Sequence, residues 1–315
     1  MNKDSKIYIA GHTGMVGSSI LRRLIAAGYS NLVFTPYPEY DLIDQKTVSD
    51  FFKKEQPEYV IDSAARVGGI QANNTYRAEF IYQNLAIQNN LIHSAYREGV
   101  KKFLFLGSSC IYPRECPQPI KEEYLLTGIL EKTNEPYAIA KIAGIKMCEN
   151  YFRQYGSNFI SVMPTNLYGP GDNYDLESSH VIPALIRKFH EAKMSEVNIV
   201  EVWGTGAPKR EFLFVDDMAD ACVFMMEQLE AEILYESGVT HINIGSGIDL
   251  SIGELAKIIA EVVGFSGDIN FDTTRPDGTP RKLLDVSRLN HLGWESSTNL
   301  RKGLEQSYQW FRRNG

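Results

Sequence analysis

Short apolar runs alternate with longer segments of mixed character through the first half of the chain. The runs are continuously apolar, which is typical of strands that are buried on both faces of a parallel sheet. The predicted strands are 7–10, 31–34, 59–61, 102–107 and 159–163, and the predicted helices are 15–27, 47–54, 78–98 and 137–155. This alternation of strand and helix predicts a parallel sheet that is covered by helices.

The pattern changes after Pro164, where turn-rich loops appear at 164–171 and 204–208. Beyond Pro164 the predicted elements are a helix at 181–192, strands at 197–202, 212–215 and 241–244, a helix that follows 212–215, and a helix that begins at Ser251. Glu254 stands at capping-box spacing from Ser251, which supports a helix start there. The second half therefore predicts further α/β elements, with one of its strands returning to the first sheet.

These elements predict a Rossmann-type doubly wound parallel α/β sheet with a smaller C-terminal α/β substrate domain. The chain has 315 residues, which exceeds the usual length of a single domain. We expect a dinucleotide-binding domain at 1–165, completed by 212–245, and a substrate domain made from 166–211 and 246–315. The active site is expected between the two domains.

Composition excludes several classes of protein. Apolar residues make up 43% of the chain and charged residues 23%, which are ordinary globular values, and the net charge of −7 argues against general nucleic-acid binding. The apolar run near the N-terminus is too short for a signal peptide or a membrane span, so no membrane association and a cytoplasmic location are expected. The four cysteines lack the paired spacing of a zinc site, so free thiols and no metal are expected.

A glycine-rich turn follows the first predicted strand and opens the first predicted helix. The glycines are Gly11, Gly14 and Gly17, and this context predicts a dinucleotide fingerprint. Glycines permit a sharp turn and a close approach of the backbone, and the amides at the helix N-terminus can bind a pyrophosphate. The alternative is a helix start that merely contains glycines.

The cofactor's adenosine ribose should lie near the end of the second strand. The chain there reads Thr35-Pro-Tyr-Pro-Glu-Tyr-Asp41, which contains no arginine for a 2′-phosphate. Glu39 could bind the ribose hydroxyls, whereas Asp41 to Asp44 could instead cap the next helix. The residues alone leave both readings open.

Tyr137 and Lys141 are four residues apart on a predicted helix and therefore share one face. The Lys141 ammonium is expected to lower the pKa of the Tyr137 phenol, which makes the phenol a better acid/base catalyst near neutrality. Ser108 follows an apolar strand and could hold a carbonyl oxygen that is being reduced. This group of side chains predicts hydride-transfer chemistry.

Longer motifs carry a family resemblance over essentially the whole chain. They are Gly107-Ser-Ser-Cys-Ile-Tyr-Pro113, Tyr137-x-x-x-Lys141, Asn166-Leu-Tyr-Gly-Pro170, Ser178-Ser-His-Val-Ile-Pro183, Ala64-Ala-Arg-Val-Gly-Gly-Ile70 and Pro276-Asp-Gly-Thr-Pro-Arg-Lys282. The chain resembles the extended short-chain dehydrogenase/reductases that act on nucleotide sugars. The resemblance implies NADP(H) as cofactor, bound by Gly11, Thr13, Gly14, Met15, Val16, Gly17, Glu39, Asp41, Leu42, Leu106, Gly107, Ser108, Tyr137, Lys141, Pro164, Asn166, Leu167 and His180.

The resemblance also implies an activity, namely 3,5-epimerisation of GDP-4-keto-6-deoxy-D-mannose followed by NADPH-dependent reduction at C4. Cys110 would be the base and His180 the acid of the epimerisation, because a thiol and an imidazole both exchange protons readily near neutrality. Ser108, Tyr137 and Lys141 would serve the reduction. The GDP-sugar would be bound by Lys188, Trp203, Arg210 and Asp277.

Several alternatives accompany these assignments. Trp203 could be ordinary core and Lys188 ordinary helix surface, and Cys116, Cys148 and Cys222 are expected to be structural. Related members often carry arginine where this chain has Thr13 and 35–37, so NAD(H) is possible. The resemblance further implies a homodimer that pairs helices 78–98 and 137–155. The rivals are another nucleotide-sugar epimerase, a 4,6-dehydratase and a non-catalytic dinucleotide sensor.

Overall fold

The computed structural model describes residues 1–275 and 277–315 and contains a six-stranded sheet in which all pairs of neighbouring strands are parallel. The strand order is β2-β1-β3-β4-β5-β9. The strands are β1 (Ile7–Ala10), β2 (Leu32–Val33), β3 (Tyr59–Asp62), β4 (Lys102–Leu106), β5 (Phe159–Pro164) and β9 (Ile242–Ile244). This sheet confirms the predicted doubly wound α/β fold.

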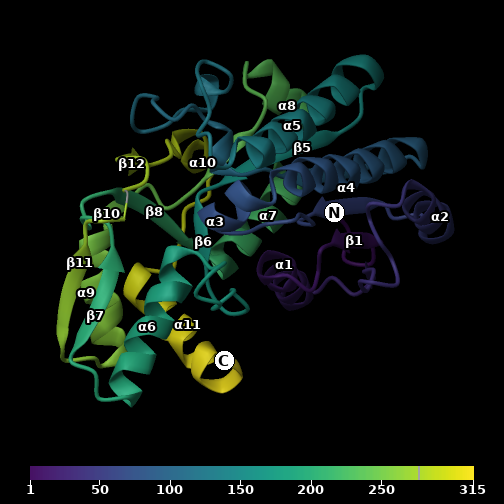
Figure 1. Cartoon of the computed structure of the whole chain (residues 1–315). Helices are drawn as coiled ribbons and strands as arrows, with labels where there is room; N and C mark the ends of the chain where they lie inside the picture. The colour runs from purple at the N-terminus through teal and green to yellow at the C-terminus, as the bar shows by residue number, and fades with distance from the viewer. Residues whose placement is uncertain (276) are drawn as a thin grey trace.

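Helices cover both faces of this sheet (Figure 1). They are α1 (Met15–Ala26), α2 (Gln45–Glu55), α3 (Ile70–Thr75), α4 (Arg77–Arg97), α5 (Glu135–Tyr155), α7 (Val215–Gln228), α8 (Ala231–Glu236) and α10 (Ser287–His291). On one face α1 and α7 pack together, and on the other α4 and α5 run side by side with α2 next to α4. Both faces of the sheet are therefore removed from water.

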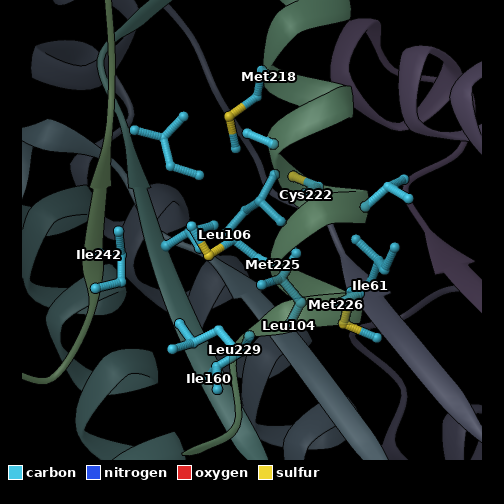
Figure 2. Close-up of a cluster of buried hydrophobic side chains, with 14 of the residues drawn as sticks. Ile61, Leu104, Leu106, Ile160, Met218, Cys222, Met225, Met226, Leu229 and Ile242 are labelled. Carbon is cyan, nitrogen blue, oxygen red and sulfur yellow. The ribbon is translucent and has the colours of Figure 1, made fainter. Parts of the chain in front are cut away.

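Side-chain alternation along the strands divides the core between the two faces. Ile7 and Ile9 face the α1 and α7 side, whereas Tyr8 and Ala10 face the α2, α4 and α5 side. Figure 2 shows the first cluster, in which strand residues such as Leu104 and Ile160 pack against Met225 and its neighbours on α7. Because both faces are apolar, the strands appear in the sequence as continuous apolar runs.

The remaining elements form a second unit at one end of the molecule (Figure 1). Its strands are β6 (Asn166–Tyr168), β7 (Ile199–Trp203), β8 (Lys209–Phe214), β10 (Asp249–Ser251), β11 (Asp268–Asp272) and β12 (Arg281–Lys282), and its helices are α6 (Val181–Met194), α9 (Ile252–Val263) and α11 (Leu300–Asn314). Strand β8 pairs with β6, β10 and β12, and β11 pairs with β7. Together these elements confirm the smaller C-terminal α/β part.

Most predicted elements are confirmed, and one strand differs in its start and in its place. The strand that the sequence placed at 212–215 begins at Lys209 and pairs outside the six-stranded sheet, although the helix that follows it packs on α1. The predicted division into domains at 165, 212 and 245 stays a prediction. The capping box between Ser251 and Glu254 is present, as its spacing predicted.

Among the described residues, no helix is both long enough and apolar enough to cross a lipid bilayer. The cytoplasmic location expected from the sequence stays a prediction. The four cysteines are free thiols, as expected, with Cys148 and Cys222 buried and Cys116 half-buried.

Candidate active site

The glycine turn between β1 and α1 is a tight backbone cradle. Gly11 has a φ of +78°, and a Cβ there would lie 2.8 Å from the backbone of Ala64. A Cβ on Gly17 would lie 2.1 Å from the carbonyl oxygen of Gly11. Gly14 caps α1 without any side chain, so the first amides of the helix, from Met15 onward, are left for a ligand. The turn thus fits the pyrophosphate of a dinucleotide.

In the predicted ribose site after β2, some residues cap the next helix and others are exposed and could contact a ligand. Asp44 caps α2 by accepting hydrogen bonds from the amides of Lys46 and Thr47, at 2.7 and 3.3 Å, and Asp41 accepts from the Ile43 amide at 2.9 Å. The helix-capping reading is therefore correct for Asp44. Glu39 is exposed and stays a candidate for the ribose hydroxyls, while Leu42 packs against the core.

The other predicted cofactor residues lie along the carboxyl edge of the sheet, because each follows or ends a parallel strand. Leu106 ends β4 and Gly107 follows it, Pro164 ends β5, and Asn166 and Leu167 belong to β6 directly beyond β5. In parallel sheets this edge is where ligands bind. The side chain of Asn166 donates to the carbonyl of Glu211 at 2.8 Å, which fixes β6 against β8.

Ser108 joins the predicted catalytic side chains. It lies between β4 and a 3₁₀ turn that carries Cys110, and its hydroxyl is near enough to the Tyr137 phenol and to the Cys110 thiol to lower the pKa of both groups. Lys141 lies one turn after Tyr137 on α5, with its Nζ 5.9 Å from the Tyr137 ring centroid. The structure thus brings Ser108, Cys110, Tyr137 and Lys141 together, as the sequence predicted.

The expected lowering of the Tyr137 pKa is wrong for this state of the protein. Burial raises the pKa of the Tyr137 phenol, and negative charge at Cys110 and Asp62 raises it further, against an opposing hydrogen bond from Ser108. Lys141 is itself buried, burial lowers the pKa of its ammonium, and that ammonium donates to the Leu106 carbonyl at 2.8 Å. Desolvation is therefore the largest influence on the pKa of both side chains.

The two predicted epimerisation residues differ in their surroundings. Cys110 is 8% exposed, and burial raises the pKa of its thiol, against the charges of Lys282 and Lys141 and a hydrogen bond from Ser108. His180 caps the N-terminus of α6 and exposes its side chain, but the protein around it still lowers its pKa by desolvation. Near neutrality Cys110 is thus a thiol and His180 an uncharged imidazole.

A hydrogen bond fixes the segment before His180 to the loop that follows β3. The Gly69 amide donates to the carbonyl of Ser178 at 3.0 Å, and a Cβ on Gly69 would lie 3.0 Å from the carbonyl of Ser179. The Asp175 carboxylate accepts from the Ser178 amide at 2.9 Å. The approach of His180 to the ring of a substrate stays a prediction.

Of the predicted substrate residues, Lys188 lies beside the Trp203 ring, and Asp277 is hydrogen-bonded to Thr205 in the loop that follows Trp203. The indole is 53% exposed, so Trp203 is not ordinary core, and the Lys188 Nζ lies 5.1 Å from its ring centroid. The Asp277 carboxylate accepts from the Thr205 amide at 2.9 Å and from its hydroxyl at 2.7 Å. Burial lowers the pKa of the Arg210 guanidinium, against the opposing charge of Asp277. An exposed aromatic ring beside cations suits an anionic ligand with a flat base.

The sequence reasoning did not assign roles to three residues that lie at this site. Arg275 places its guanidinium 4.9 Å from the Trp203 ring centroid. Lys282 lies opposite Arg210 in the pairing of β12 with β8, and its charge acts on Cys110. Lys282 appeared in the sequence as the last residue of the motif at 276–282, and Arg275 stands directly before that motif. Asp62, at the end of β3, is fully buried close to Lys141, and no sequence pattern marked it.

Among residues 1–275 and 277–315, His, Cys, Asp and Glu form no cluster of three or more that could hold a metal ion. The donors at the site are instead backbone amides at the start of α1, hydroxyls, a thiol and cations. This set fits a dinucleotide and a phosphorylated sugar.

Residues 7–245 match the model of the NAD dependent epimerase/dehydratase family. The chain is 58% identical to GDP-L-fucose synthase 1 of Arabidopsis thaliana, covering 99% of this chain and 95% of that protein. It is 56% identical to GDP-L-fucose synthase of Escherichia coli, covering 98% and 97%. It also resembles the crystal structure of a GDP-D-glycero-L-gluco-heptose synthase from Campylobacter jejuni, obtained in the presence of NADPH, with a TM-score of 0.93, 42% identity and 99% of each chain covered.

Proposed function

The chain belongs to the NAD dependent epimerase/dehydratase family, and we propose that within it the protein acts as a GDP-L-fucose synthase. It would invert C3 and C5 of GDP-4-keto-6-deoxy-D-mannose and then reduce C4 with a nicotinamide cofactor. The observation that carries this proposal is the position of Ser108, whose hydroxyl lies near enough to the Tyr137 phenol and the Cys110 thiol to lower the pKa of both. A substrate carbonyl oxygen bound by Ser108 would therefore lie beside both the thiol for the epimerisation and the phenol for the reduction.

The inversion depends on the acidity that a 4-keto group gives to the hydrogens at C3 and C5. Cys110 removes such a proton, and the Ser108 and Tyr137 hydroxyls stabilise the enolate oxygen at C4. His180 must first take up a proton from solvent, and as an imidazolium it returns that proton to the opposite face of the ring, which inverts the centre and leaves a neutral imidazole. The thiol must first lose its own proton, and Lys282 and Lys141 favour its ionisation because their positive charges lower the thiol pKa.

The reduction uses the same carbonyl after the ring has been inverted. A reduced nicotinamide, when bound, supplies the hydride to C4. Tyr137 gives its phenolic proton to the developing alkoxide oxygen, while Ser108 donates a hydrogen bond to that oxygen. Lys141 holds a positive charge next to the phenolate that Tyr137 becomes, which lowers the energy of proton transfer.

Trp203 and the charged residues around it support a GDP-sugar as substrate. We assign Lys188 and Arg210 to the diphosphate, since arginine offers a two-pronged donor set to phosphate oxygens. Trp203 offers an aromatic surface, and Asp277 can accept hydrogen bonds from the base or from sugar hydroxyls. The dinucleotide lies in the cradle made by Gly11, Gly14 and Gly17 and along the carboxyl edge of the sheet.

We propose NADPH as the preferred reductant, on the family resemblance and on the NADPH used with the Campylobacter enzyme. The segment 35–41 contributes no cation, and its Glu39 is exposed. The expected result is therefore a modest preference, with kcat/KM for NADPH above that for NADH. Steady-state kinetics with both reductants measures it, and a kcat/KM that strongly favours NADH would overturn the assignment.

We also propose a homodimer that pairs α4 and α5 with the same helices of a second copy. These two helices run side by side and expose large apolar side chains, among them Tyr82 on α4 and Ile139 and Tyr155 on α5. Light scattering after size exclusion should give about twice the 35.5 kDa of one chain. A mass of one chain at micromolar concentration would contradict this pairing.

The experiment that tests the proposed function is incubation of the purified protein with GDP-4-keto-6-deoxy-D-mannose and NADPH, followed by identification of the sugar. GDP-L-fucose is the expected product. A 6-deoxy sugar that keeps the D configuration at C5 would mean reduction without epimerisation. A failure to oxidise NADPH would instead favour the rival epimerase, dehydratase or sensor.

A further inference from the structure

Asp62 is a buried carboxylate that the mechanism above does not use. It ends β3 and is 0% exposed. Its Oδ1 accepts a hydrogen bond from the Ala64 amide at 3.1 Å, whereas its Oδ2 is buried without a hydrogen-bond partner among the described residues. An unsatisfied buried carboxylate is costly, so its presence needs a physical reason.

The strand register places Asp62 on the face of the sheet that α5 covers. Asp62 pairs with Ala10 of β1 on one side and with Phe105 of β4 on the other. Ala10 and Phe105 both belong to the apolar cluster beneath α2, α4 and α5. Side chains that are directly opposite in a sheet point to the same face, so Asp62 points toward α5.

Lys141 reaches the same place from α5. Its Nζ lies 4.7 Å from the ring centroid of Phe105 and donates to the carbonyl of Leu106, the next residue along β4. Asp62 and the Lys141 ammonium are therefore both neighbours of Phe105. Both are buried, with Lys141 only 3% exposed.

The charges that face Asp62 come mainly from α5. They are the Lys141 ammonium and the ionisable groups of Tyr137 and Cys148, together with Tyr8 of β1. Burial raises the pKa of Asp62 to about 6, against the charge of Lys141. Burial lowers the pKa of Lys141, against the negative charges of Asp62 and then Cys110. Lys141 is thus the cation that favours ionisation of Asp62.

We propose that Asp62 is a positioning residue whose carboxylate is the buried counter-charge that keeps Lys141 protonated beside Tyr137. The inference rests on the proposed reductase function. The proposed role explains why Asp62 is buried with an unsatisfied oxygen, because a negative charge there offsets the desolvation of the Lys141 ammonium. Asp62 is fully buried, and in this proposal it acts on the reaction through Lys141.

The direction of the effect follows from the two charges. With Asp62 ionised, Lys141 keeps its proton to a higher pH than it would in the same apolar surroundings alone. Neutralising Asp62 removes this support, so Lys141 loses its proton at lower pH. The reduction needs the ammonium. The pH above which the rate declines should therefore be lower when Asp62 is neutralised than in the wild-type protein.

The test uses Asp62→Asn, which has the same shape and keeps an oxygen for the Ala64 amide. The reaction to follow is oxidation of GDP-L-fucose by NADP⁺, because this reverse step needs no epimerisation. We expect the alkaline limb of the kcat profile to move about one pH unit or more toward lower pH. An unchanged limb in a folded, active variant would overturn the proposal.

A matched control is Glu122→Gln. Glu122 is another buried carboxylate, 4% exposed, whose Oε1 accepts from the Asn243 amide at 3.1 Å. Lys141 is not among the charges that act on it. The control should leave the alkaline limb in place, even where it lowers the melting temperature. A shift of the same size in both variants would show a general effect of removing a buried charge and would overturn the proposal.

A second measurement covers the case in which Asp62→Asn does not fold. The wild-type chain, with isotope-labelled lysine Cε, is titrated by NMR, and the Lys141 signal is assigned with Lys141→Arg. The Lys141 signal should respond as Asp62 titrates at about pH 6. A Lys141 signal without a step there would overturn the proposal. Wild-type protein that does not oxidise GDP-L-fucose would instead contradict the proposed function and leave the NMR result to decide the role of Asp62.

Discussion

Replacing Cys110 by Ala is expected to lower the entry of solvent deuterium into C3 and C5 of GDP-4-keto-6-deoxy-D-mannose by about 100-fold or more. The thiol is the group placed beside Ser108 that can remove those protons, and Ala leaves nothing to accept them. NMR of the sugar after incubation in heavy water measures the exchange. Oxidation of GDP-L-fucose by NADP⁺ should persist in the variant, because that step uses Ser108, Tyr137 and Lys141.

The pH dependence of this exchange has a defined sign. Burial raises the pKa of the Cys110 thiol, so the thiolate fraction, and with it the exchange rate, should rise with pH through the neutral range. Cys116→Ala is the matched control, since Cys116 lies in the same loop and is half-buried, and it should leave exchange unchanged. Undiminished exchange in Cys110→Ala would remove Cys110 from its role.

Replacing Tyr137 by Phe is expected to slow the reduction by about 100- to 10,000-fold while deuterium exchange at C3 and C5 continues. Phe fills the same space but has no proton to give to the alkoxide at C4. Transient kinetics of NADPH consumption, with exchange followed in parallel, separates the two stages. Ser108 still binds the enolate oxygen in this variant, so exchange should fall far less than reduction.

The control for this variant is Tyr151→Phe, on the same helix. The Tyr151 hydroxyl hydrogen-bonds to the Nδ1 of His93 at 2.8 Å, away from the catalytic residues. It should leave both stages near their wild-type rates. Equal losses of exchange and reduction in Tyr137→Phe would mean that the proposed division of labour between Cys110 and Tyr137 is wrong.

The sequence predicted the strands of the main sheet because burial on both faces makes each of them a continuous apolar run. It did not predict β11 and β12, and the reason is visible in their composition. Strand β12 consists of Arg281 and Lys282, and β11 begins and ends with aspartate. Strand β12 pairs with β8 and contains no apolar residue, whereas β11 pairs with β7 and alternates polar with apolar residues over only five positions.

Tyr137 and Lys141 were found because their spacing is local, and Cys110 and His180 were found through the family resemblance, whereas the pKa values of these residues depend on the whole fold. The spacing of four residues on a helix predicted that Tyr137 and Lys141 are neighbours, and the structure confirms this. The spacing could not show that both are desolvated, and desolvation reverses the expected direction for Tyr137. Asp62 was missed for a related reason, because an aspartate after an apolar strand is usually an exposed turn residue.

The central claim is that one site inverts two centres by exchange with solvent and then adds a hydride that does not come from solvent. The most direct measurement is a single incubation of substrate and NADPH in heavy water, with NMR of the purified product. The expected product is GDP-L-fucose with deuterium at C3 and C5 and hydrogen at C4. A product with hydrogen retained at C3 and C5, or with solvent deuterium at C4, would contradict it.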